Sequence, residues 1–316
     1  DYHLQSQYGR YNPTSRAWVS DGRQSPCIDA GDPSESVGDE PLPNGGRINM
    51  GAYGGTRQAS KSPEYAVYHV DGATGRDWNN GLSRTYAFKT IQAAVNAARN
   101  GDTVLVWPGV YTLSPAEEVT FNRKAITVQS AADAAVIVAT KGYAFSFWGA
   151  ESSRSVVANF VITGSGQGAI FCDQGASPTL RNLTIVRNDF GIAAYGGADP
   201  DIVNCILWEN STGDLFGCKA RYSCVQQGSG DKNAGNISVD PLFADPDNGD
   251  FHLKSRYGRY VAERDEWVTD SVMSPCIDAG DPDHSPRAER TPNGNRINMG
   301  AYGGTPYASL SGWPPF

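Results

Sequence analysis

The sequence lacks features that would mark several common classes of protein. It has no run of 18 or more apolar residues, so it predicts no membrane-spanning helix. Basic residues are in the minority, with 26 Lys and Arg against 34 Asp and Glu, and the net charge of −8 argues against nucleic acid as a partner. The six cysteines form no Cys-x-x-Cys pair, which argues against a zinc or redox motif.

The chain also lacks a recognisable secretory signal peptide, and it begins with Asp1 rather than Met. We therefore expect a processed chain or a part of a longer protein. The even number of cysteines favours an oxidising compartment, although only weakly. We expect the protein to be secreted, in the extracellular space or at the cell surface.

Glycine and proline are abundant, with 36 and 19 residues, while charged residues make up only 19% of the chain. Glycine and proline separate short strands at turns, so this composition favours a turn-rich β protein over a helical one.

A long internal repeat organises the sequence. Residues 1–60 align with residues 250–309 without a gap, and 37 of the 60 positions are identical. Such identity at a constant offset indicates tandem duplication. We expect residues 1–63 to be the tail of a preceding repeat unit, and residues 241–316 to be the equivalent tail of the second unit.

A shorter repeat lies between the two tails. The segment "SPTLRNLTIVRN" (177–188) aligns with "DPDIVNCILWEN" (199–210), so that Pro178 falls on Pro200 and Asn188 on Asn210, and apolar runs such as "AIFC" and "IAAY" recur in parallel with it. Short strands at this spacing, separated by Gly and Asn turns, are typical of a parallel β-helix. A β-propeller blade needs about 40–45 residues, which this period does not provide. We expect an all-β fold, a right-handed parallel β-helix of six or seven coils over residues 103–240.

Residues 64–102 are expected to form an N-terminal cap. Phe88, Ile91, Ala94, Val95 and Ala98 recur at helical spacing, and Asn100-Gly101 is a helix stop signal. An amphipathic helix at this place would cover the open end of the coil stack, where unpaired backbone groups invite aggregation.

Two stretches resemble known proteins. "AFKTIQAAVNAARNGDTVLVWPGVY" is similar to the cap and first coil of pectate-lyase-like right-handed β-helix proteins. "DPLFADPDNGDFHL", "SPCIDAGDP" and "RINMGAYGG" resemble the C-terminal part of large secreted repeat proteins of the planctomycete type. The resemblance implies the fold and secretion. Its functional implication is broad, because this fold carries lyases, hydrolases, adhesins and structural fibres.

The coils carry no evident catalytic pattern. When the coils are stacked at the shorter period, no carboxylate lies on another, whereas a glycosidase or lyase needs clustered carboxylates. Arg187 stacks on Glu209, which predicts a surface ion pair. The four histidines all lie outside the coils, so a Ser-His-Asp arrangement has no support from spacing. Enzymatic activity stays open, and the sequence favours its absence.

Three kinds of binding or structural site remain as candidates. Aspartates in the tails provide the oxygen ligands that calcium prefers, and the alternative is that they form ordinary turns. Cys205 and Cys224 occupy equivalent coil positions and are expected either to form a disulfide or to stack as buried thiols. Trp208 occupies an outward position and is a candidate for stacking on a glycan. The candidate calcium ligands are Asp29, Asp32, Asp245, Asp247, Asp278 and Asp281.

The preferred interpretation is a non-catalytic extracellular structural protein. Apolar residues of the first tail need burial, so we expect head-to-tail association with further copies or repeats into a fibre, sheath or surface layer. The alternative is a carbohydrate-active enzyme, a polysaccharide lyase or glycoside hydrolase, or a glycan-binding adhesin. In that case the partner would be an extracellular polysaccharide. Calcium is the one cofactor that the sequence suggests.

Overall fold

A computed structural model describes the chain except residues 33–34, 46, 115–116, 150, 228–233 and 313–316. The chain divides into two compact units, Asp1–Ala66 and Val67–Phe316, and each is described by itself. Within the described residues, no helix has the length and apolar character that crossing a bilayer requires.

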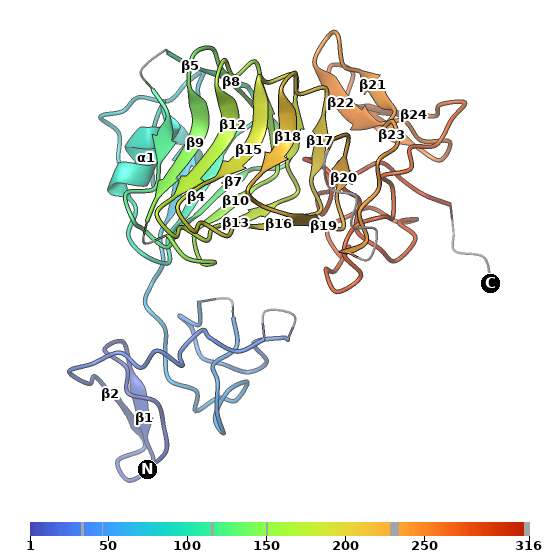
Figure 1. Ribbon diagram of the computed structural model, residues 1–316. Helices are drawn as coiled ribbons and strands as arrows, with labels where there is room; N and C mark the ends of the chain where they lie inside the picture. Colours follow the sequence, from blue (N-terminus) through green and yellow to red (C-terminus); the bar gives the residue numbers. More distant parts are fainter. Residues whose placement is uncertain (33–34, 46, 115–116, 150, 228–233, 313–316) are drawn as a thin grey trace. The chain divides into compact units, whose positions relative to one another are not determined.

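The larger unit is a parallel β-helix whose strands form three sheets (Figure 1). Five coils contribute a strand to every sheet, and β19 and β20 add part of a sixth, which is close to the six or seven coils expected. The all-β parallel β-helix predicted from the sequence is therefore confirmed. The first sheet contains β3 (Val67–Val70), β4 (Thr103–Val106), β7 (Thr127–Ser130), β10 (Val156–Ala158), β13 (Thr179–Arg181), β16 (Asp201–Val203) and β19 (Ala220–Arg221). The second sheet contains β5 (Val110–Leu113), β8 (Ala135–Ala139), β11 (Phe160–Thr163), β14 (Thr184–Val186), β17 (Ile206–Trp208) and β20 (Cys224–Val225). The third sheet contains β6 (Val119–Thr120), β9 (Tyr143–Trp148), β12 (Gly168–Asp173), β15 (Phe190–Ala194) and β18 (Gly213–Phe216).

The repeat period sets which side chains stack. In the first sheet Val157 pairs with Leu180, and Leu180 pairs with Ile202, so each apolar residue lies on its equivalent in the next coil. These side chains point inward and are buried. Burial of one such side chain contributes about 1.5–3 kcal/mol, so the column of apolar residues is the main source of stability.

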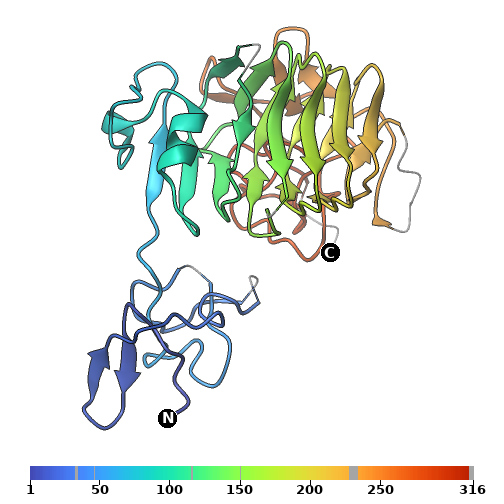
Figure 2. The ribbon, with the colours of Figure 1, turned by 60° about the vertical axis from the view of Figure 1, so that its left-hand side comes forward.

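Helix α1 (Ile91–Ala97) lies at the end of the stack where the first coils are (Figure 2). The Thr90 hydroxyl accepts a hydrogen bond from the Ala93 N–H and caps its start. At the other end the Lys124 ammonium donates to the carbonyl oxygens of Val95 and Asn96, at 2.7 and 2.9 Å. The helix ends before the expected Asn100-Gly101 stop signal, because the backbone is already extended at Ala98. Gly101 then donates its N–H to the Ala125 carbonyl of the next coil. A short 3-10 helix, η1 (Arg84–Tyr86), precedes α1.

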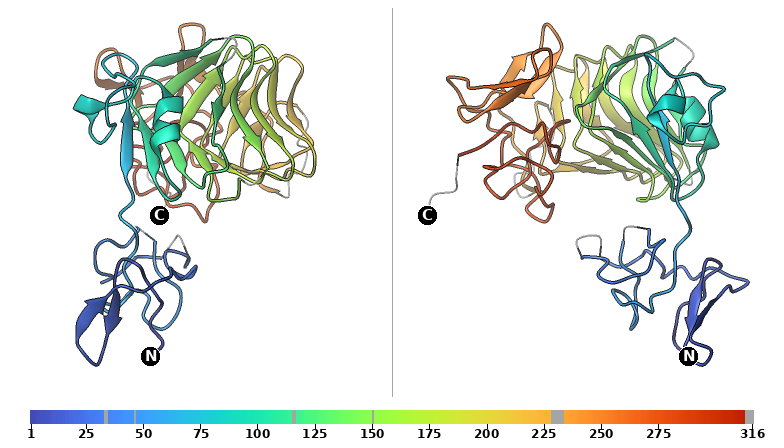
Figure 3. Two further views of the ribbon diagram at one scale, coloured as in Figure 1. Left: turned by 90° about the vertical axis from the view of Figure 1, so that its left-hand side faces the viewer. Right: turned by 180° about the vertical axis from the view of Figure 1, so that it is seen from behind.

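The C-terminal tail folds back along the coils (Figure 3). It contains two antiparallel hairpins, and its apolar residues pack on the outward side chains of the second sheet in a core of their own. Asn159 and Asn182, at the turn between the first and second sheets, donate side-chain hydrogen bonds to carbonyls of residues 298–303. The outer face of the second sheet is thus covered from β8 to β20. The hairpin strands are β21 (Phe243–Asp245), β22 (Asp250–Leu253), β23 (Arg259–Val261) and β24 (Glu266–Val268).

The smaller unit has the same internal structure as this tail. Its hairpin of β1 (Arg10–Asn12) and β2 (Ala17–Val19) matches the β23–β24 hairpin in register. Buried Asn49 and its equivalent Asn298 both donate to the backbone, with N···O distances of 2.7 and 2.8 Å to Ser60 and Ser309. The duplicated sequence therefore folds in the same way in both places.

Candidate functional site

Six aromatic side chains form a continuous strip on the outside of the third sheet, whose strands β9, β12, β15 and β18 lie side by side in Figure 1. Phe171 is at its centre, with ring centroids 4.9 Å from Trp148, 5.0 Å from Tyr143 and 5.8 Å from Tyr195. The ring centroid of Phe216 lies 4.9 Å from that of Tyr195 and 6.4 Å from that of Phe190. We call this set the aromatic strip; its members are Tyr143, Trp148, Phe171, Phe190, Tyr195 and Phe216.

The strand register places the strip across four coils. Phe171 on β12 is paired with Ala193 on β15, and Ala193 is paired with Phe216 on β18, so the two phenylalanines share one outward row. Adjacent strands lie about 4.8 Å apart, which sets the spacing of the rings along the stack.

Two glycines make room for rings that lie across the neighbouring strand. A Cβ on Gly168 would lie 2.8 Å from the Tyr143 ring, and a Cβ on Gly213 would lie 3.1 Å from the Phe190 ring. Each glycine is paired in register with the aromatic residue that covers it. These aromatic residues therefore lie flat along the sheet because the next strand has no side chain at that place.

The strip is open to solvent at three of its members. Trp148, Tyr195 and Phe216 are 42%, 47% and 49% exposed, while the central Phe171 is half-buried beneath them. A contiguous apolar patch on an otherwise polar surface marks a binding site more often than a single exposed ring does.

Polar groups border the strip on the side where β9 and β12 end. Asp173 is paired in register with Trp148, and its carboxylate accepts the Gln174 N–H at 2.7 Å. Tyr143 lies where β9 begins. Burial raises the pKa of its hydroxyl, with further contributions from Tyr195 and Glu118, so the phenol remains a hydrogen-bond donor at neutral pH. The rim therefore offers both acceptors and donors.

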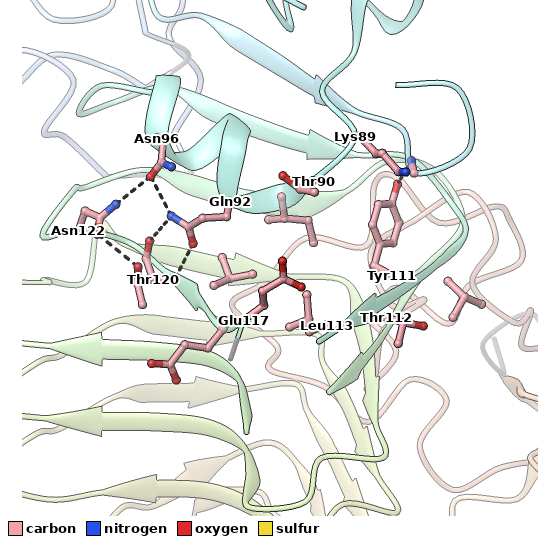
Figure 4. A pocket seen from close by; sticks show the side chains of 15 residues that line it. Lys89, Thr90, Gln92, Asn96, Tyr111, Thr112, Leu113, Glu117, Thr120 and Asn122 are labelled. Atoms are coloured by element: carbon pink, nitrogen blue, oxygen red, sulfur yellow. Dashed lines mark hydrogen bonds between the residues drawn. The ribbon is translucent and has the colours of Figure 1, made fainter. Parts of the chain in front are cut away.

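A cavity of about 530 Å³ opens between α1, β5 and β6, in line with the strip. Its lining combines the buried apolar residues Ile91, Tyr111 and Val119 with polar side chains, among them Gln92, Asn96, Thr120 and Asn122, and Figure 4 shows these polar side chains. The outward row of the third sheet connects the two features, because Thr120 of the cavity is paired with Ser146, and Ser146 is paired with Phe171.

A network of amides forms one wall of the cavity. The Gln92 side chain donates to Asn96 at 2.9 Å and accepts the Thr120 N–H at 2.9 Å. Asn122 donates to the same Asn96 oxygen at 3.1 Å. These bonds hold α1 against β6, and the fixed amides are suited to binding hydroxyl groups.

Two carboxylates line the cavity. Glu117 accepts hydrogen bonds from the Ser114 hydroxyl and N–H, at 2.5 and 2.9 Å, and these bonds lower its pKa. Glu118 accepts the Ser146 hydroxyl at 2.5 Å and so connects the cavity to the start of the strip. None of the described residues lining the cavity is a histidine or a cysteine.

The strip does not coincide with the predicted glycan-stacking residue. The Trp208 side chain is partly buried and packs against the core beneath the tail. The alternation was correct in pointing Trp208 outward; what the sequence does not reveal is that the tail returns over this sheet. The recurring aromatics in "AFSFW", "AIFC", "IAAY" and "DLFG" were the available signal.

The structure does not bring Cys205 and Cys224 together. Cys224 is paired in register with Ile206 rather than with Cys205, and a shift of one residue turns a side chain to the opposite face of a strand. Cys205 lies in the coil core, and Cys224 lies beneath the tail beside Cys276. All six cysteines are free thiols.

The six candidate calcium ligands are dispersed. Asp281 forms ion pairs with Arg221 and His284, and Asp247 pairs with Arg187. Asp245 accepts a hydrogen bond from Asn248 at 2.8 Å, and Asp29 accepts one from Ser62 at 2.6 Å. The remaining two lie at tail turns: Asp278 is the repeat equivalent of Asp29, and Asp32 is that of Asp281. Over the described residues, no three His, Cys, Asp or Glu side chains gather as metal ligands would.

The predicted stacking of Arg187 on Glu209 is confirmed. Their side chains form an ion pair with an N···O distance of 2.9 Å, and both are exposed. An exposed pair of this kind contributes under about 1 kcal/mol, so its role is structural.

Part of the chain matches the model of a known protein family. The model of a family described as disaggregatase related matches residues 128–280, which span the coils from β7 to β20 and the first part of the tail. This match agrees with a parallel β-helix. No curated protein and no solved structure matches the chain.

Proposed function

We propose that this chain is a polysaccharide-binding structural unit, which holds an extended glycan chain along the aromatic strip. The observation that carries the proposal is the continuous strip of six rings across four coils, open to solvent on an uncovered sheet. The family model that matches residues 128–280 is described as disaggregatase related.

The chemistry of the strip suits a sugar polymer. The apolar C–H face of a pyranose ring stacks on an aromatic ring, and the hydroxyl groups at its edge require hydrogen-bond partners. Tyr195 and Phe216 provide exposed ring surface, and Asp173 provides acceptors at the rim. Because the rings recur at the strand spacing, the strip favours a repeating ligand over a single small molecule.

The same proposal includes the position of the protein. We place it outside the cell, where such polymers are found, with units that follow one another in a series as a fibre, sheath or surface layer. The duplicated tail supports a series of units, because residues 1–60 fold as the end of a unit.

Retention of the full chain in native gels that contain soluble polysaccharides tests glycan binding. A panel of uronate-rich and neutral polymers is used, and we expect at least one to slow migration. Tyr195→Ala and Trp148→Ala should each weaken binding about five- to tenfold, from the loss of about 1–1.4 kcal/mol of stacking. Trp78→Ala is the matched control, because Trp78 is an exposed aromatic residue outside the strip. Unchanged migration in every polymer would overturn the proposal.

Glycan cleavage is a second candidate, favoured by one observation: Glu117 and Glu118 line a cavity in line with the strip. A lyase or hydrolase would release unsaturated or reducing ends from a bound polymer. Glu118→Gln should abolish that release while retention in the gel persists. If the wild-type chain binds a polymer and releases no ends, binding alone is the function.

A further inference from the structure

The two tails share their internal structure but differ in their surroundings. In each tail a buried histidine stacks on a tyrosine, with ring centroids 3.6 Å apart for His3 and Tyr53 and 3.7 Å apart for His252 and Tyr302. The fold of the tail is therefore independent of what covers it. This makes the second tail a template for the first.

One face is buried in the second tail and open in the first. Phe251 and Met299 are 4% and 1% exposed, whereas their equivalents Tyr2 and Met50 are 89% and 49% exposed. Two further positions differ in the same direction: Cys276 and Ala301 are fully buried, Cys27 is half-buried and Ala52 is exposed. We call the set Tyr2, Cys27, Met50 and Ala52 the open tail face.

The outer face of the second sheet covers the equivalent residues of the second tail. Phe251, Cys276, Met299 and Ala301 belong to one buried cluster with outward side chains of the coils. Those coil residues lie on β11, β14, β17 and β20, and they are Val161, Val186, Ile206 and Cys224.

Hydrogen bonds fix the register of this contact. The Asn159 side chain donates to the Ala301 and Gly303 carbonyls at 3.0 and 2.9 Å. Asn182, one coil further along, donates to Gly300 at 3.3 Å and to Asn298 at 3.2 Å. The backbone of residues 49–54 has the same sequence and the same local structure, so it presents the same acceptors.

We propose that the open tail face binds the outer face of the second sheet of another coil stack of this kind, in the manner in which residues 250–303 bind β11 to β20. The partner is the coil stack of a neighbouring repeat unit. Contact along the side of the stack differs from the end-on packing expected from the sequence. The inference rests on the series of units proposed above and is independent of glycan binding.

The histidines of the two tails agree with this assignment. His252 lies between Asp250 of its own tail and Asp133 of the coils, with N···O distances of 2.7 and 3.5 Å, and its pKa is raised by these carboxylates despite its burial. His3 has the equivalent partner Asp1, and burial lowers its pKa. A coil stack bound to the first tail would supply the second carboxylate.

Thiol reactivity measures the contact directly. Residues 67–249 are added in front of Asp1 of the full chain, so that a coil stack precedes the first tail as it precedes the second. We expect alkylation of Cys27, followed by peptide mass spectrometry, to slow at least about tenfold relative to the unextended chain. Cys276 is the internal control, because it is buried in both proteins. Equal Cys27 rates in the two proteins would overturn the proposal.

A matched variant separates contact from general protection. Met50→Glu places a charge on the open tail face, where the unextended chain tolerates it because Met50 is exposed. In the extended protein this variant should restore rapid labelling of Cys27. Met50 lies outside the aromatic strip, so Met50→Glu should leave the polysaccharide retention of the unextended chain and of the extended protein each unchanged. Failure of the contact and failure of glycan binding are therefore distinguishable.

A second measurement uses the chain without any addition. Met299→Glu weakens the contact of the second tail and uncovers the second sheet for the open tail face of another copy. Sedimentation should then show concentration-dependent dimers that Met50→Glu abolishes. If the added copy of residues 67–249 does not fold, sedimentation of the Met299→Glu chain tests the proposal in its place. A Met299→Glu protein that stays monomeric counts against the proposal.

Discussion

Glu289 gives the second tail a marked dependence on pH. Its side chain is buried, and one carboxylate oxygen accepts the N–H groups of Asn298 and Gly304 at 2.9 and 2.7 Å. The other oxygen has no hydrogen-bond partner among the described residues. Burial raises the pKa of Glu289 from 4.5 to about 7.

The raised pKa fixes the sign of the effect. Below pH 4.5 the carboxyl group is protonated in both the folded and the unfolded chain, so its contribution to stability is fully present. As the pH rises towards 7 the unfolded chain ionises first, and stability is lost. A difference of this size corresponds to about 3 kcal/mol at pH 8. Glu289→Gln keeps an oxygen for both N–H groups and cannot ionise.

We therefore expect Glu289→Gln to stabilise the tail by about 3 kcal/mol at pH 8 and to change its stability by less than about 1 kcal/mol at pH 4.5. Hydrogen exchange of the Asn298 and Gly304 amides in urea gives the free energy of opening of this region. Glu263→Gln, at an exposed glutamate of the same tail, is the control. A wild-type tail equally stable at both pH values, with a Gln variant that is weaker at pH 8, would refute the reasoning.

Two further changes test the contacts that position the tail and the helix. Asn182→Ala removes both side-chain hydrogen bonds to the tail backbone and places alanine at a φ of +49°. The free energy of opening of the tail should fall by about 2–3 kcal/mol in the same exchange experiment. Ser152→Ala, at a half-buried serine of the coils, is the control and should leave it unchanged. Lys124→Met leaves the last carbonyls of α1 without their side-chain donor. The amides of residues 91–97 should then open for exchange at a free-energy cost about 1 kcal/mol lower. Unchanged exchange would show that Lys124 does not stabilise the helix.

The fold was predictable because residues paired in successive coils are separated by a nearly constant number of positions in the sequence. Thr179 is paired with Asp201 and Leu180 with Ile202, as the alignment of 177–188 with 199–210 requires. The period shortens in the last coil. Ile206 is paired with Thr184 in the coil before and with Cys224 in the coil after, and Cys224 is the nearer of the two in sequence. That change is local to one turn, so the alignment placed Cys224 one position out of register.

The candidate site was less predictable because it depends on parts that are distant in sequence. The strip needs Phe171 and Phe216 in one outward row, which follows from the exact register of three strands. The cavity combines α1 with β5 and β6. The tail decides which outward aromatics stay exposed: it covers Trp208 and leaves Tyr195 open.

The central claim is that a glycan lies along the aromatic strip, and a crystal structure with a bound oligosaccharide tests it most directly. The oligosaccharide is cut from the polymer that the gel assay selects. We expect successive sugar rings over Tyr195 and Phe171, with hydroxyl groups towards Asp173. A glycan bound elsewhere, with the strip empty, would contradict the account.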